Sequence, residues 1–254
     1  MPPMPPLDPH VAARKGFRES EERIRRFWKE ASVEAQDERW AVLLDGRAPK
    51  TPAGAPLVLP TRAAAELCRA EWAAQGEYLE PETLFFTRLA ATAIDRIGAA
   101  RDAVAAEIAA YAGSDLLCYL ADSPTALVER QAREWGPWRD RAAREPGLRL
   151  DPVAGIIHQP QPPETLARMT ALALALDDFA LAGLAMAGPL FGSAVLGLAV
   201  QRGALSGEAA FELSRLDEAF QEEQWGADEE AAARTASRRA EAMRLDQWFR
   251  ALEE

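Results

Sequence analysis

The spacing of apolar positions divides the chain into a short part with a strand-like pattern and a long part with a helical pattern. In the first part, the apolar run at residues 40–45 ends in Asp45-Gly46, a pair that is typical of a tight hairpin turn. A second apolar run at residues 56–60 is bounded by prolines, which suit strand ends or an edge strand. Thr61 then stands where a helix N-cap is expected. These signals predict a small antiparallel sheet followed by a helix, whereas residues 17–33 fit either a short helix or an irregular arm.

Beyond this region, apolar residues recur at three- and four-residue spacing, which is typical of helices. The predicted helical stretches are 83–97, 102–111 after a break at Gly98, 124–144 and 229–252. Prolines predict that residues 148–163 form a long irregular connection. The predicted fold class is therefore α+β, with a small antiparallel-sheet domain before a larger all-helical domain. The predicted divisions are a mobile tail at 1–16, the small α+β domain at 17–83 and the helical domain at 84–254.

An uncharged run at residues 179–200 is long enough to span a membrane. Gly188-Pro189 divides this run, and Asp177-Asp178 precedes it without a flanking basic cluster. Two helices buried at the centre of a bundle explain the pattern better, so we expect no stable insertion into a membrane.

The helical pattern of residues 205–225 has two faces of different character. One stripe contains Leu205, Ala209, Leu213, Leu216 and Phe220. The opposite side carries Phe211, Glu218, Glu222 and Trp225. Because unpaired glutamates are costly to bury and aromatic residues are not needed on a purely solvated face, this mixture suits a surface that meets another protein. The alternative is a helix packed on both sides within a bundle, with the glutamates at its margins.

Composition and charge narrow the function classes. The net charge of −11 and the pI of about 4.9 argue against a general nucleic-acid binder, because affinity for a phosphate backbone is largely electrostatic. Cys68 and Cys118 lie far apart without a metal-ligand or redox motif, and are expected to be free thiols in a reducing compartment. The N-terminal residues resemble neither a secretory signal nor an import segment, so the predicted location is the bacterial cytoplasm.

Motifs for catalysis are absent from the sequence. It contains no Walker phosphate loop, no dinucleotide-binding glycine motif and no HExxH motif. The histidines are His10, in the proline-rich start, and His158, in the irregular connection. We therefore predict a protein that is not an enzyme, with no cofactor and no metal. The alternative is a small-molecule enzyme in which His158 acts with carboxylates of the C-terminal region.

Several short sequence segments, taken in their order along the chain, resemble those of one protein family. They are Arg26-Phe27-Trp28-Lys29, Leu44-Asp45-Gly46-Arg47 with Lys50-Thr51-Pro52, Leu59-Pro60-Thr61, Glu71-Trp72 with Gln75, Asp115-Leu116-Leu117-Cys118-Tyr119, Gln131 with Glu134-Trp135, and Leu213-Ser214-Arg215-Leu216-Asp217-Glu218 with Gln221 and Trp225-Gly226. Together they resemble the assembly-chaperone family for the alpha subunit of the F-type ATP synthase catalytic head, which is found in mitochondria and alphaproteobacteria.

The resemblance implies a chaperone that binds free alpha subunit and shields its subunit interface until the beta subunit replaces it. It also implies a small α+β domain before a helical domain, and a location in the bacterial cytoplasm or, in a eukaryote, the mitochondrial matrix. Function in the family is tied to acids of the C-terminal helical region, and the best matching positions are Asp217, Glu218, Glu222 and Glu223. With Phe211 and Trp225 from the helical pattern, these acids make up the predicted partner-binding surface.

Overall fold

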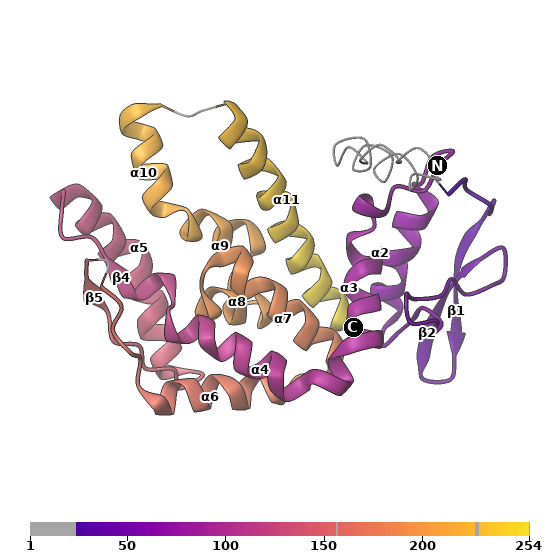
Figure 1. Ribbon diagram of the computed structural model, residues 1–254, viewed down its shortest axis with the longest axis horizontal. Helices are drawn as coiled ribbons and strands as arrows, with labels where there is room; N and C mark the ends of the chain where they lie inside the picture. Colours follow the sequence, from indigo (N-terminus) through magenta and orange to yellow (C-terminus); the bar gives the residue numbers. More distant parts are fainter. Residues whose placement is uncertain (1–23, 156, 227–228, 254) are drawn as a thin grey trace, which may run out of the picture.

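The structure, a computed structural model, describes residues 24–155, 157–226 and 229–253. A small antiparallel sheet comes first and is followed by a large helical part, so the predicted α+β class is confirmed (Figure 1). The tail predicted at residues 1–16 lies outside the described residues.

The sheet has the strand order β1-β2-β3, and both pairings are antiparallel. Its strands are β1 Ala31–Gln36, β2 Arg39–Leu44 and β3 Val58–Leu59. The strands expected near 40–45 and 56–60 are thus confirmed. Strand β1 begins inside the stretch 17–33, for which a short helix or an irregular arm was predicted, and continues beyond it. Asp45 and Gly46 adopt positive φ values of 47° and 77° in the predicted turn. The Asp45 carboxylate accepts hydrogen bonds from the backbone amides of Glu30 and Lys29, and these bonds lower the pKa of Asp45.

Helix α2 (Arg62–Ala73) packs on this sheet and begins at the predicted cap, where the Thr61 hydroxyl accepts from the Ala64 amide at 3.1 Å. The following segments are η1 Pro81–Thr83, α3 Phe85–Thr92, the π-helical turn η2 Ala93–Ile97 and α4 Gly98–Gly113. The last three run on as one helix because Gly98 keeps helical dihedral angles, so the predicted break at Gly98 is wrong. Glu71 of α2 accepts from the amides of Phe86 and Thr87, and thereby caps the start of α3. Burial raises the pKa of Glu71.

The remaining elements build the helical part. They are η3 Leu116–Cys118, β4 Tyr119–Leu120, α5 Thr125–Arg144, β5 Val153–Ala154, α6 Pro163–Leu174, α7 Asp178–Phe191, α8 Ala194–Gln201, α9 Gly207–Ser214, α10 Leu216–Trp225 and α11 Glu229–Leu252. Strand β5 lies in the connection predicted to be irregular and pairs in parallel with β4. The uncharged run at 179–200 does form two helices, but they divide at Gly192 and Ser193 rather than at Pro189. No helix in the described part of the chain is long and apolar enough to cross a membrane.

Helices α7 and α8 form the centre of the helical part, and most of their side chains are buried. Helix α11 crosses this centre, where the Trp248 indole donates to the Phe179 carbonyl at 3.1 Å. At the same C-terminal end α11 also reaches the start of α2, because the Thr61 hydroxyl donates to the Ala251 carbonyl at 2.5 Å. The boundary placed between residues 83 and 84 stays a prediction.

A buried carboxylate ties η3 to the start of α8. Asp115 is fully buried and accepts from the backbone amides of Leu117 and Val195, each at 3.1 Å. Burial raises the pKa of Asp115 to about 6, although hydrogen bonds from Ser193 and the amides oppose that shift.

Candidate partner-binding surface

The segment predicted as one helix across residues 205–225 is two helices. Arg215 leaves the helical region, with φ −113° and ψ 19°, and separates α9 from α10. The two faces expected of a single helix therefore do not persist across the segment. Phe211, on α9, is only 2% exposed and belongs to the core, so the prediction that it lies on the outer side with Glu218 and Trp225 is wrong.

Helix α10 extends from the body and stands apart from the first half of α11 in the view of Figure 1. Leu216 is its buried residue, and Leu213 and Phe220 pack against the core while partly exposed. Leu216 and Phe220 attach α10 to the body, and Leu213 packs against the core from the end of α9. At its far end the Trp225 side chain is 81% exposed, which gives α10 a large apolar group in contact with solvent.

Two of the predicted acids bond to side chains of α5. Asp217 accepts from the amide Nε2 of Gln131 at 2.7 Å, and Gln131 is only 1% exposed. Both carboxylate oxygens of Glu223 accept from the Arg130 guanidinium at 2.8 Å. The Trp135 indole adds a bond to the Leu213 carbonyl at 2.9 Å. Asp217 therefore serves as a structural link between α10 and α5.

The other two acids lie near Arg215. Glu222 pairs with the Arg215 guanidinium at 2.5 Å, and the same guanidinium lies over the Phe211 ring, 5.8 Å from its centre. Glu218 is exposed and lines a cleft together with Arg215. Arg215, at the break between α9 and α10, thus contacts both the Phe211 ring and the Glu222 carboxylate.

This cleft has a volume of about 400 Å³ and lies between the end of α7 and helices α9, α10 and α11. Leu190, Phe191 and Phe211 supply apolar surface, and Glu218 contributes a carboxylate at the side of α10. Opposite them, the Arg238 guanidinium of α11 donates to the last carbonyls of α7, those of Pro189 and Leu190. The cleft therefore combines an apolar floor with charges of both signs.

Comparisons with known proteins decide the family. The sequence model described as ATP12 chaperone protein matches residues 25–143. The crystal structure of Atp12 from Paracoccus denitrificans is 43% identical to this chain, with a TM-score of 0.84, and the match covers 90% of this chain and 98% of that one. The chain belongs to the ATP12 chaperone family. It therefore belongs to the class of ATP synthase assembly chaperones, as the sequence phrases indicated.

Two further relatives extend the ATP12 match. A mutant of Paracoccus denitrificans Atp12p, in which an aspartate is replaced by lysine, is 44% identical with a TM-score of 0.84; the match covers 91% of this chain and 98% of that one. The mitochondrial protein atp12 of Schizosaccharomyces pombe is 26% identical over 220 residues, covering 82% of this chain and 76% of that protein. The similarity thus includes the helical C-terminal part that carries α10.

The alternative of a small-molecule enzyme requires His158 to lie near carboxylates of the C-terminal region. The described contacts of this ATP12 family member do not bring these groups together. The Nδ1 atom of His158 lies 2.8 Å from the Tyr119 hydroxyl, whereas Asp217 and Glu223 of α10 bond to α5 and Glu222 bonds to Arg215. Among the residues that the structure describes, no group of three or more His, Cys, Asp or Glu side chains could hold a metal ion. Cys68 and Cys118 are free and buried, and burial raises the pKa of Cys118 to about 12.

Proposed function

We propose that this protein binds the free alpha subunit of the F-type ATP synthase and shields the surface that the beta subunit later covers. The observation that carries the proposal is the form of α10, an acidic helix with an exposed tryptophan, in a member of the ATP12 chaperone family. The protein acts by covering a surface, and no chemical step is required of its residues.

The physical need for such a partner comes from the free subunit. A subunit of a closed ring exposes apolar area that the assembled ring would seal, and exposed patches of that kind aggregate. A chaperone that covers them has to bind with moderate affinity, because the final subunit must displace it by forming a more favourable interface. An exposed helix at the margin of the fold suits reversible binding of this kind.

The proposed contact surface consists of Glu218, Glu222 and Trp225, with the cleft floor that includes Phe211 beside them. Trp225 would supply the apolar anchor, since aromatic residues dominate the energy of many interfaces. The carboxylates would orient a basic edge of the client and raise the association rate more than the affinity. Asp217 and Glu223 would contribute by holding α10 against α5.

The proposed place of action is the compartment in which the catalytic head is assembled, the bacterial cytoplasm or the mitochondrial matrix. Both kinds of source occur among the relatives, from Paracoccus denitrificans and from the mitochondria of fission yeast.

Co-purification tests the proposal. The tagged full-length chain should be isolated from its own cells at moderate salt, and the co-eluting proteins identified by mass spectrometry. The expected result is recovery of the ATP synthase alpha subunit without beta subunit. Recovery of intact alpha–beta assemblies, or of neither subunit, would contradict the proposed function.

A further inference from the structure

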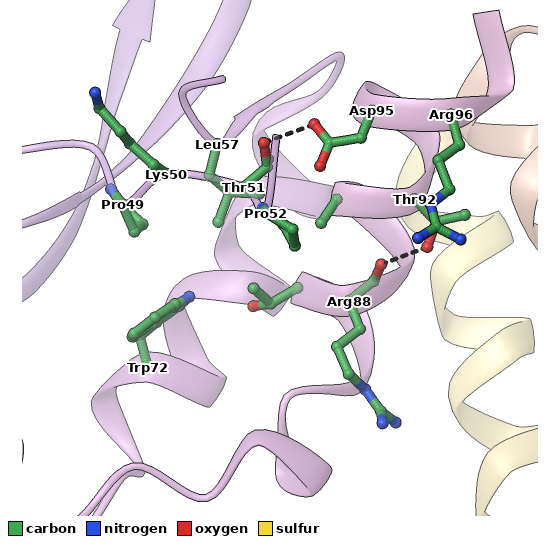
Figure 2. A pocket seen from close by; sticks show the side chains of 12 residues that line it. Pro49, Lys50, Thr51, Pro52, Leu57, Trp72, Arg88, Thr92, Asp95 and Arg96 are labelled. Carbon is green, nitrogen blue, oxygen red and sulfur yellow. Dashed lines mark hydrogen bonds between the residues drawn. The ribbon is translucent and has the colours of Figure 1, made fainter. Parts of the chain in front are cut away.

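A second cavity of about 400 Å³ lies in the N-terminal part, between the loop that joins β2 to β3 and helices α2 and α3 (Figure 2). Its inner surface is apolar and includes Leu57, Trp72 and Ala91, all of which are buried residues. The volume falls within the range of about 300–1,000 Å³ that is common for ligand sites. The cavity shares no lining residue with the cleft beside α10.

The walls of the cavity are fixed to one another. Asp95 accepts from the Thr51 hydroxyl at 2.6 Å and from the Ala53 amide at 3.0 Å, so the loop is tied to the helix opposite (Figure 2). Asp95 lies in the π-helical turn η2, and such turns within helices occur frequently at functional sites. The cavity is therefore already formed in the free protein.

Three cations surround the apolar surface. Lys50, Arg88 and Arg96 line the cavity, their side chains are exposed, and none pairs with a carboxylate among the described residues. Asp95, the acid among the described lining residues, already accepts two hydrogen bonds from the loop. Although the whole chain has a net charge of −11, the surroundings of this cavity are locally basic and therefore favour an anionic partner.

An unpaired donor adds a second kind of signal. The indole Nε1 of Trp72 is buried, in a residue that is only 9% exposed, and it has no hydrogen-bond partner among the residues that the structure describes. Its nitrogen points toward the cavity (Figure 2). Buried donors nearly always have an acceptor, so this N–H is suited to an acceptor that a ligand supplies.

We propose that the cavity binds an extended segment of a partner protein in which an apolar side chain lies next to an aspartate or glutamate. The apolar side chain contacts Leu57 and Ala91, the carboxylate pairs with Arg88 and Arg96, and a main-chain carbonyl accepts from the Trp72 indole. A small inorganic anion would pair with the cations but would leave the apolar surface without a contact. This proposal does not depend on the identity of the client at α10.

The test uses the full-length chain labelled with ¹⁵N, because its indole N–H resonances report directly on Trp72, which the Trp72→Phe variant assigns. The probe is the acetylated and amidated pentapeptide Gly-Asp-Leu-Glu-Gly, and the matched control is Gly-Asn-Leu-Gln-Gly. Titration with the acidic peptide should shift the Trp72 indole proton downfield, the direction expected on formation of a hydrogen bond. The neutral peptide should bind about tenfold more weakly, because it lacks two surface charge pairs that contribute up to about fivefold each.

The variant Arg88→Glu with Arg96→Glu should lower the affinity for the acidic peptide by at least about tenfold. The control is Arg144→Glu with Arg149→Glu, which makes the same change in net charge at exposed arginines outside the cavity lining and should leave the affinity unchanged. Unchanged indole resonances of the other tryptophans would verify that each variant is folded. Equal binding of both peptides, an equal shift with inorganic phosphate, or no shift of the Trp72 resonance would overturn the proposal.

Discussion

Helices α7 and α10 are held in place by different forces. Most residues of α7 are buried, whereas α10 buries Leu216 and relies on polar links to α5. Burial of a large apolar side chain contributes about 1.5–3 kcal/mol, whereas an exposed ion pair contributes about 0–1 kcal/mol. Changes in α7 therefore act on folding, and changes on the outer side of α10 act on what the helix can bind.

Removal of apolar volume from α7 should have the largest effect on stability. Leu181→Ala removes a fully buried side chain and should lower the free energy of unfolding by about 2–5 kcal/mol. Trp225→Ala on α10 should change it by less than about 0.5 kcal/mol, because that side chain is 81% exposed. Urea unfolding monitored by circular dichroism measures both. A loss for Trp225→Ala as large as that for Leu181→Ala would show that α10 is part of the core.

Substitutions that break the link between α10 and α5 should lower the free energy of unfolding by an intermediate amount. Asp217→Ala leaves the nearly buried Gln131 amide without its acceptor, which should cost about 1–3 kcal/mol. Glu223→Ala removes an ion pair with a half-exposed carboxylate and should cost less than about 1 kcal/mol. Hydrogen exchange should report faster exchange of the α10 amides in the first variant than in the second. Equal exchange in both would remove the structural role assigned to Asp217.

The stability of the core should depend on pH because of the buried Asp115. Because burial raises its pKa in the folded protein from the ordinary value of 3.8 to about 6, folding favours the protonated form. The stability that Asp115 contributes is thus present at low pH and is lost as pH rises through about 6. The penalty of Asp115→Asn should be larger at pH 5 than at pH 7.5 by about 1 kcal/mol. Urea unfolding at the two pH values measures it, and a smaller penalty at pH 5 would contradict the assigned shift.

Local signals in the sequence predicted those elements that neighbouring residues determine. The cap at Thr61, the turn at Asp45-Gly46 and the two central helices are decided by side-chain bonds, positive φ values or continuous apolar sequence. Strand β1 is different, since its sequence ASVEAQ contains residues that favour helix as well as strand. Pairing with β2, which lies later in the chain, decides its structure.

The break between α9 and α10 also depends on contacts that the local pattern does not contain. Leu213 and Leu216 keep helical spacing across it, so the sequence predicted one helix. Gly207 at the start of α9 lies so close to α11 that an added Cβ would be 2.1 Å from the Ala242 carbonyl oxygen. This close approach fixes α9 against α11 and leaves Phe211 in the core.

The candidate site was predictable in composition and not in geometry. Glu218 and Glu222 stood out because they adjoin aromatic residues at helical spacing, and the family resemblance added Asp217 and Glu223. Which of them serve structure depends on Gln131 and Arg130 of α5, which lie far away in the sequence. The cavity beside Trp72 could not be predicted from the sequence, because its cations come from the loop and from a helix that is distant along the chain.

The most direct test of the account is capture of purified alpha subunit by two charge-reversal variants. Glu218→Lys changes the cleft beside α10, and Glu107→Lys makes the same change at an exposed position of α4. Surface plasmon resonance on variants with unchanged unfolding curves should find affinity reduced about tenfold for Glu218→Lys, mainly through slower association, and unchanged for Glu107→Lys. Equal affinities for the two variants would contradict the assignment of α10 as the surface that meets the client.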